Sequence, residues 1–251
     1  MATITFRFYG PLNDFLPPAR RQATLVCEYT GRASVKDTIE ALGVPHPEVD
    51  LVVVNGAPAT FDVILHPGDH VSVYPAFGLV DLPGGVRLTP PLVERRFVAD
   101  AHLGRLAAYL RLLGFDTLYR NDFADEVIAE TSQREDRVVL TRDVGLLKRA
   151  VVQRGYFLRA TEPGRQVVEV VRRFDLGPHA HPFSRCLRCN EPLAPVSKAH
   201  VAPLVPPRSR EQFEEFSRCP ACRRVYWKGS HYARMARLVE ASLAAAERTG
   251  L

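Results

Sequence analysis

Residues 96–114 read RFVADAHLGRLAAYLRLLG, a short apolar strand pattern that runs into a helical pattern and stops at a glycine. The same order of strand and helix recurs three more times before residue 175. Strands and helices that alternate in this way are typical of a parallel sheet covered by helices. The region therefore predicts an α/β domain whose first helix buries one apolar face, formed by Leu103, Leu106, Ala107, Leu110 and Leu113.

Acidic side chains stand at the ends of the predicted strands. Asp100 and Asp143 each come directly after an apolar strand, and Asp125 with Glu126 opens the intervening helix. Ligands of an open parallel sheet gather outside the carboxyl ends of its strands. Carboxylates at that edge suit Mg²⁺ or Mn²⁺, which activate water for phosphodiester cleavage. The sequence therefore predicts a catalytic cation site formed by these acids.

The same residues also suit a structural role. Aspartate is a favoured helix N-cap, and Asp100 and Asp143 each precede a predicted helix. Two arginines are candidates for holding a phosphate: Arg105, one turn into the first helix, and Arg142, beside Asp143. Both arginines are equally suited to pair with the acids. Catalysis and capping remain alternatives, and removal of Asp143 would separate them.

Four cysteines form two close pairs, Cys186 with Cys189 and Cys219 with Cys222, and 29 residues separate the pairs. This spacing suits a structural zinc ion held by four thiolates. Two disulfides are the alternative, but they leave Cys27 over as a fifth cysteine in an apolar run. We therefore predict a zinc ribbon, with Cys27 as a small core residue.

The first 80 residues follow the order strand, strand, helix, strand, strand, which is the order of a β-grasp domain. The turns at residues 54–56 (VNG) and 67–69 (PGD) resemble those of the ubiquitin-like sulfur carriers. Such carriers act through a C-terminal glycine pair. Gly84-Gly85 is internal here and lies in a proline-containing connector, so we favour a linker over a carrier role.

Charge and composition narrow the function classes. A hydrophobic content of 46% excludes a disordered chain, and no apolar run approaches the ~20 residues that span a bilayer. We expect a cytoplasmic protein without a leader peptide or a membrane partner. Residues 1–80 carry 5 basic and 8 acidic side chains (−3), whereas residues 81–251 carry 28 and 20 (+8). The basic part predicts a polyanionic partner such as RNA.

Basic residues of the predicted ribbon interleave with Tyr226 and Trp227. This combination suits single-stranded RNA, whose bases stack on aromatic rings while its phosphates meet arginine. Alternatively, the two aromatic side chains fill the core of a small ribbon. The basic residues are Arg185, Arg188, Arg218, Arg223, Arg224 and Lys228.

Several short motifs carry a resemblance to a known family. They are ADAHLGRL (99–106), LTRD (140–143) and YWKGSH (226–231), together with the segments LGFDT, PFSRC, PVSK and CPAC. Residues 95–235 resemble the Mut-seven C-terminal ribonuclease domain family, a PIN-like nuclease fold joined to a zinc ribbon. Some members carry an N-terminal ubiquitin-like domain. The resemblance implies metal-binding acids at Asp100, at Asp125 or Glu126, and at Asp143.

PIN-like nucleases often have a fourth acid shortly after the third, and residues 144–148 contain none. A single-ion site, or one completed by substrate, is therefore kept as the alternative to a full two-metal site.

We thus predict a metal-dependent ribonuclease with structural Zn²⁺ and catalytic Mg²⁺ or Mn²⁺. RNA is its expected partner, and a protein partner is considered for the β-grasp domain. The alternative is a non-catalytic RNA-binding adaptor. The predicted parts are a β-grasp domain (1–80), a linker (81–94), a PIN-like domain (95–178), a zinc ribbon (179–232) and a C-terminal helix (233–251).

Overall fold

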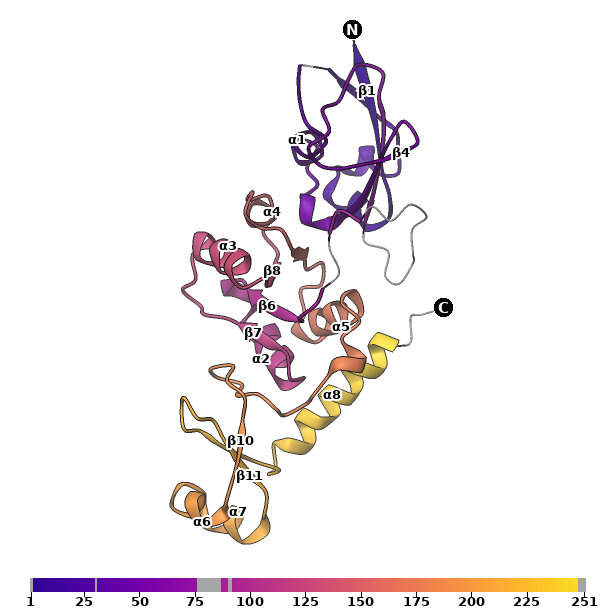
Figure 1. Ribbon diagram of the computed structural model, residues 1–251. Coiled ribbons are helices and arrows are strands. Elements are labelled where there is room, and N and C mark those ends of the chain that lie inside the picture. Colours follow the sequence, from indigo (N-terminus) through magenta and orange to yellow (C-terminus); the bar gives the residue numbers. More distant parts are fainter. Residues whose placement is uncertain (1, 30, 76–86, 90–91, 248–251) are drawn as a thin grey trace. The chain divides into compact units, whose positions relative to one another are not determined.

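The computed structural model describes residues 2–29, 31–75, 87–89 and 92–247 (Figure 1). The chain divides into two compact units, one of Met1–Val93 with Ala129–Phe157 and one of Glu94–Ile128 with Leu158–Leu251. Most of the predicted linker, including Gly84 and Gly85, lies outside the described residues. The linker and the carrier role therefore remain sequence predictions.

The first unit contains a five-stranded sheet in the order β2-β1-β5-β3-β4. The β1–β5 pair is parallel and the other pairs are antiparallel, which confirms the β-grasp prediction. The short β4 was not predicted; it follows the turn at Asn55-Gly56. The strands are β1 (Thr3–Phe8), β2 (Leu25–Glu28), β3 (Val49–Val54), β4 (Ala57–Ala59) and β5 (His70–Pro75).

The segment Ser34-Val35-Lys36-Asp37 predicts a capped helix start, and helix α1 (Val35–Ala41) begins there. The Ser34 hydroxyl accepts a hydrogen bond from Asp37 N at 3.1 Å. The helix buries Val35 and Ile39 against the alternating apolar side chains of β1. Short 3₁₀ segments complete the domain: η1 (Gly10–Phe15), η2 (Pro18–Arg20) and η3 (His46–Glu48).

The first unit also holds the parallel pair β8 (Val138–Thr141) and β9 (Gly155–Phe157) with helix α4 (Val144–Leu147) between them. The apolar pattern of residues 144–152 predicts a helix over that whole range, and α4 is shorter. The Glu48 carboxylate accepts a hydrogen bond from Phe157 N at 2.5 Å. The β-grasp domain thereby satisfies a backbone donor of β9.

The second unit contains the parallel pair β6 (Arg96–Ala99) and β7 (Asp116–Leu118). The segment η4 (Ala101–Leu103) leads into α2 (Gly104–Leu112), and α3 (Asp125–Arg134) begins in this unit. The two parallel pairs confirm the α/β prediction. Helix α5 (Pro163–Arg173) packs on α2, and η5 (Gly177–His179) follows it.

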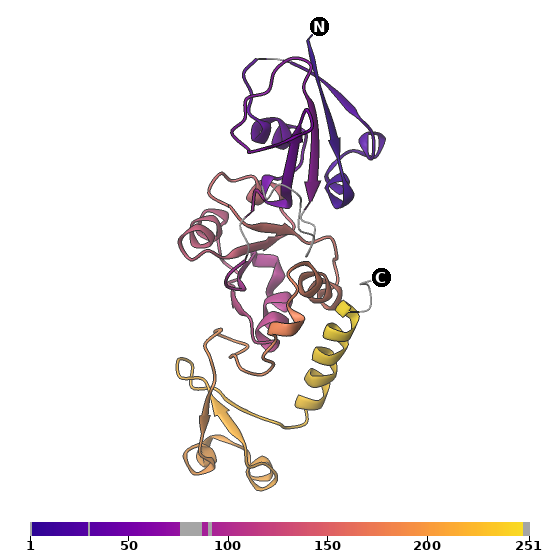
Figure 2. The same ribbon diagram turned by 45° about the vertical axis from the view of Figure 1, so that its right-hand side comes forward.

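Helix α8 (Tyr232–Glu247) runs alongside α5 in Figures 1 and 2. Arg172 Nε donates to Ala246 O at 3.3 Å, so the C-terminal helix docks on α5. None of the described helices is both long enough and apolar enough to cross a membrane.

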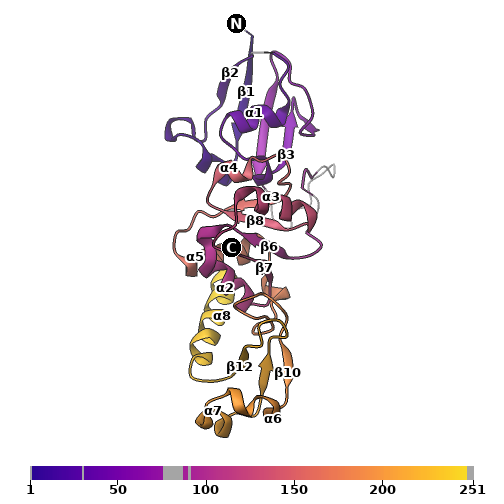
Figure 3. The same ribbon diagram turned by 90° about the vertical axis from the view of Figure 1, so that its left-hand side faces the viewer.

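The cysteine-rich part forms an antiparallel sheet in the order β10-β11-β12 (Figure 3). Its small core consists of Val201, Val205 and Phe216, with Trp227 packed against it. The elements are β10 (Ala194–Val196), α6 (Lys198–Val201), η6 (Ala202–Leu204), α7 (Pro207–Gln212), β11 (Phe216–Arg218) and β12 (Val225–Trp227).

Candidate functional site

The four predicted zinc ligands meet in the second unit. Their sulfur atoms all lie within 4.8 Å of one another. Among the described residues, these four cysteines are the group whose ligand atoms lie close enough together to hold a metal ion. Adjacent sulfurs are 3.3 Å apart for Cys189 and Cys219, 3.4 Å for Cys189 and Cys186, and 3.6 Å for Cys186 and Cys222. Tetrahedral zinc with Zn–S bonds of about 2.3 Å requires sulfurs roughly 3.8 Å apart. The donor set therefore fits Zn²⁺.

The two cysteine pairs have the same backbone geometry. The nitrogen four residues after the first cysteine donates to that cysteine's carbonyl, at 2.9 Å from Asn190 and 3.0 Å from Arg223. Each first cysteine in turn donates its N–H to the carbonyl five residues on, at 2.8 Å and 2.9 Å. Asn190 and Arg223 both have positive φ, +72° and +62°. We call the two CxxC loops, residues 186–191 and 219–224, the first and second knuckle. Each knuckle is closed by main-chain hydrogen bonds that place its two thiols on the same side.

A tyrosine hydroxyl borders the cluster. Tyr226 Oη lies 3.1 Å from Cys186 Sγ. Burial raises the pKa of Cys186, but hydrogen bonds from Tyr226 and neighbouring backbone outweigh it and lower that pKa to about 6. Burial and the adjacent Cys219 and Cys186 sulfurs raise the pKa of Cys189 to about 12.

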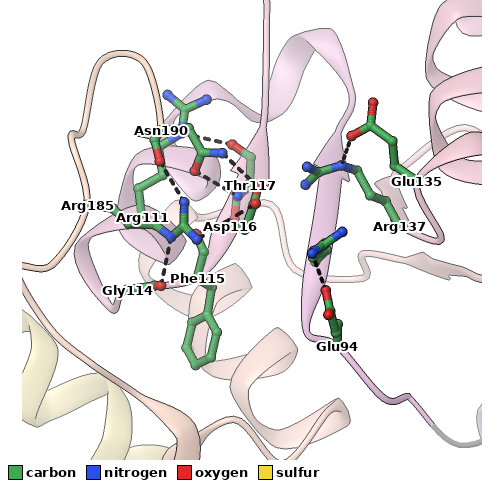
Figure 4. A network of polar contacts seen from close by, with 11 residues as sticks. Glu94, Arg111, Gly114, Phe115, Asp116, Thr117, Glu135, Arg137, Arg185 and Asn190 are labelled. Carbon is green, nitrogen blue, oxygen red and sulfur yellow. Dashed lines mark hydrogen bonds and ion pairs between the residues drawn. The ribbon is translucent and has the colours of Figure 1, made fainter. Parts of the chain in front are cut away.

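The first knuckle is held against helix α2 by a buried arginine, drawn in Figure 4. Arg111 is 4% exposed. One guanidinium nitrogen, Nη1, donates to the carbonyls of Leu187 at 3.1 Å and Arg188 at 3.0 Å, inside the CxxC loop. Its Nε donates to Thr117 O at 2.9 Å. Arg111 therefore ties the zinc knuckle to α2 and β7 at once.

Arg111 also has an electrostatic role. Burial lowers its pKa, and the nearby Cys186 and Cys189 sulfurs act in the opposite direction. A guanidinium nevertheless stays protonated in proteins. Four thiolates around Zn²⁺ carry a net charge of −2, so this buried cation offsets part of the charge of the loaded centre.

Asn190 makes a second link. Its Nδ2 donates to Asp116 Oδ1 at 2.7 Å, and its Oδ1 accepts from Thr117 N at 2.9 Å. Arg185 adds a third, donating from Nε to Gly114 O at 3.1 Å and from Nη1 to Asn190 O at 2.8 Å (Figure 4). The ribbon and the α2–β7 segment thus form one hydrogen-bonded body.

Gly114 provides a direct test of this docking. Its φ is +97°, and an added Cβ would lie 2.3 Å from His181 O, a backbone atom that cannot turn away. We expect Gly114→Ala to destabilise the second unit by about 2–4 kcal/mol, since steric overlap adds to backbone strain. Thermal unfolding would measure the loss.

Gly164→Ala is the matched control, because an added Cβ there meets nothing within 4 Å. That substitution lies in the first turn of α5 and should leave the melting temperature equal or slightly higher. Equal melting temperatures for the two variants would contradict the close approach at Gly114.

The predicted catalytic acids divide between the two units. In the second unit, Asp100 follows β6 and is 6% exposed. Its Oδ1 accepts a hydrogen bond from Ala101 N at 2.5 Å, and its Oδ2 lies 3.3 Å from His102 Nδ1. Asp125 is half-buried and Glu126 exposed in the first turn of α3. Asp100 thus caps η4 through one oxygen, as the structural alternative expected.

In the first unit, Asp143 is exposed and caps α4, because its Oδ1 accepts from Gly145 N at 2.6 Å. Its own N–H donates to Thr141 Oγ1 at 2.9 Å. Arg142 is half-buried beside it, and Arg105 of the other unit is exposed on α2. Capping is therefore observed at both aspartates, while the catalytic role of all six residues remains a prediction.

Carboxylates of this kind have the right chemistry for a hard cation. Mg²⁺ is commonly held by one or two carboxylates, with water and substrate phosphates in its other positions. Asp100, with Asp125 or Glu126 in the same unit, offers such donors. The metal-ligating cluster found among the described residues is the cysteine tetrad, so a cation site at these acids, completed by substrate, stays a prediction.

The sequence did not reveal Arg111, Asn190 or Asp116 as functional partners of the zinc centre. Arg111 interrupts an otherwise apolar run of the helix, and this interruption was the only local indication of a special role for it. Asn190 directly follows Cys189 and has positive φ, a conformation for which asparagine is well suited. Their partners, however, are 73 to 77 residues away in the chain.

Comparison with known proteins gives two matches to family models. The Mut7-C RNAse domain matches residues 95–239, and the Mut7-C ubiquitin domain matches residues 1–81. Neither a curated protein nor a solved structure matches the chain. The first model spans more than half of the chain. The protein belongs to the Mut7-C RNAse domain family and carries that family's N-terminal ubiquitin-like domain.

Proposed function

We propose that this chain is a metal-dependent ribonuclease that hydrolyses RNA phosphodiester bonds. The observation that carries the proposal is Asp100, a buried carboxylate directly after a strand of a parallel pair in a chain of the Mut7-C RNAse family. A buried acid at the carboxyl end of such a strand has the position in which α/β proteins bind ligands. Burial also strengthens its attraction for a cation.

In this proposal Asp100, with Asp125 or Glu126, holds Mg²⁺ or Mn²⁺. The bound ion would supply an activated water and stabilise the leaving oxygen. His102, 3.3 Å from Asp100 Oδ2, orients that carboxylate. Arg105 is exposed at the start of α2 and would bind a phosphate of the RNA. The ribbon, with its surplus of basic side chains, would hold the RNA.

The second candidate is a non-catalytic RNA-binding adaptor. It is supported by a specific observation, since Asp100 and Asp143 both act as helix N-caps. A cap needs only one carboxylate oxygen, so capping leaves the cation role open. The two candidates differ in whether RNA is cut after it is bound.

A cleavage assay separates them. Purified protein would be dialysed to remove weakly held ions while the zinc centre stays loaded, then mixed with labelled single-stranded RNA. We expect cutting only after Mg²⁺ or Mn²⁺ is added, because water activation requires the ion. The same strand made of DNA would measure sugar preference. Binding without cutting under every metal condition would favour the adaptor.

A further inference from the structure

A cavity of about 240 Å³ lies between the zinc ribbon, the end of α2 and the start of α8. Its volume falls below the roughly 300–1,000 Å³ typical of pockets for whole drug-sized molecules. It is therefore suited to a single flat ring. Apolar side chains such as Leu112, Leu187 and Leu193 contribute to its lining.

Four aromatic side chains also line this cavity: Phe183, Tyr226, Trp227 and Tyr232. All four are half-buried. The Phe183 and Tyr232 rings lie 4.5 Å apart and are tilted by 32°. This pair joins the chain before the first knuckle to the start of α8. We call the four aromatic side chains together the aromatic wall.

Two features hold the aromatic wall in place. Phe183 has a φ of +63°, a rare conformation for a bulky residue, and its N–H donates to Leu112 O at 2.9 Å. Trp227 lies over Gly229 so closely that an added Cβ would be 2.7 Å from Trp227 Nε1. Strained residues held by their surroundings often mark ligand sites. The aromatic wall is thus preformed.

The opening of the cavity carries charge. Lys228 and Glu215 both line it and pair at 2.6 Å, with exposed fractions of 59% and 77%. A carboxylate accepts hydrogen bonds from the amino and imino groups of a base, and an ammonium attracts a phosphate. Residues 179–251 carry 12 basic and 6 acidic side chains, a net +6, so this part attracts a polyanion.

A second cavity of about 300 Å³ lies against the same residues, since Tyr226, Trp227, Tyr232 and Met235 line both. Two adjoining cavities that share the rings of Tyr226, Trp227 and Tyr232 suit a flexible RNA strand whose neighbouring bases turn to either side. Double-stranded RNA cannot present bases in this way, because its bases are stacked and paired.

We propose that the cavity lined by Phe183, Trp227 and Tyr232 binds an unpaired base of single-stranded RNA. The inference rests on the proposed function only for the identity of the polymer. It assigns RNA capture to the junction of the ribbon with α8, in the second unit. The base stacks on the aromatic wall, Glu215 meets its polar edge, and Lys228 meets the adjoining phosphate.

Binding of a short labelled oligouridylate to the full zinc-loaded chain, without added Mg²⁺ or Mn²⁺, tests the proposal. Tyr232→Leu keeps apolar volume but removes the ring, so it should weaken binding roughly 5- to 150-fold, as loss of one stacked base does. Tyr232→Phe keeps the ring and should bind as the wild type does. Tyr109→Leu, a tyrosine of α2 that does not line either cavity, is the matched control.

Photo-crosslinking gives a measurement independent of folding effects. RNA that contains iodouridine should crosslink to wild-type protein within residues 183–235. Equal affinity for Tyr232→Leu and wild type, or crosslinks confined to other regions, would overturn the proposal and leave an apolar protein segment as the ligand. Because Mg²⁺ and Mn²⁺ are absent, the assay measures base binding alone, and a failure of cleavage is observed separately.

Discussion

Cys219→Ser is expected to lose the zinc ion and to unfold the ribbon. Cys219 is fully buried within the tetrad, and three remaining thiolates cannot close a tetrahedral shell. Loss of groups that merely support metal ligands costs about 10–100-fold in affinity, so loss of a ligand should exceed a hundredfold. Zinc content after competition with a chelator, measured by elemental analysis, would show the loss.

The unfolding follows from the small size of the ribbon core. That core contains three buried apolar residues among those described, Val201, Val205 and Phe216. Small domains with so little buried apolar surface need a metal or disulfides. In zinc-finger peptides the ion contributes about 10–16 kcal/mol of binding free energy, which is also folding free energy. Hydrogen exchange should therefore rise sharply over residues 185–228 of the variant.

Cys27→Ser is the matched control. Cys27 is half-buried in the first unit, and burial raises the pKa of its thiol. This variant should retain one zinc per chain and the slow exchange of the ribbon. Wild-type zinc affinity in Cys219→Ser would show that the tetrad does not hold the ion.

The docking network extends the consequence beyond the ribbon. Arg111 is buried and its Nη1 donates to two carbonyls of the first knuckle, so a melted knuckle leaves this guanidinium with only the Thr117 carbonyl of these three acceptors. An unpaired buried charge is strongly destabilising, by about 3–5 kcal/mol. Zinc loss should therefore lower the stability of α2 and β7 as well, while the β-grasp strands keep their protection.

Local patterns in the sequence were sufficient to predict much of this structure. The paired cysteines, the capped start of α1 and the alternating strand–helix units each depend on residues close together in the chain. Helix α4 was predicted too long because Val151 and Val152 extend an apolar run, although the helix ends at Leu147. Strand β4 contains Pro58 and spans three residues, which is too short to show the alternation of apolar and polar side chains that indicates a strand.

The contacts that fasten the ribbon could not be predicted in the same way. Arg111, Asn190 and Asp116 are polar residues whose partners are far away in the chain, and polar positions carry no periodic signal. The aromatic cavity could not be predicted for the same reason, because its lining residues come from separate segments of the chain. The sequence predicts either RNA contacts or core packing for Tyr226 and Trp227. Trp227 packs against the ribbon core and also lines the cavity.

Asp100→Asn should abolish RNA cleavage and leave the fold and RNA affinity unchanged. Asparagine caps a helix as well as aspartate does, so its Oδ1 still accepts from Ala101 N. What disappears is the negative charge that would hold the cation. Metal assistance contributes several kcal/mol to the transition state, and each 1.36 kcal/mol is a factor of ten, so the rate should fall at least about a hundredfold.

Because Asp100→Asn keeps the helix cap, it tests the loss of the negative charge alone. Its controls also replace one aspartate by asparagine. Asp122→Asn removes an exposed carboxylate that pairs with Arg120 at 2.7 Å, and it should cut RNA at the wild-type rate. Asp143→Asn, measured in the same series, tests the predicted further ligand, since its cap to Gly145 N also survives the change.

Full activity in Asp100→Asn would reduce this residue to a helix cap and exclude it from the catalytic site. Lost activity with retained RNA affinity would assign it the charge-dependent role that capping cannot explain.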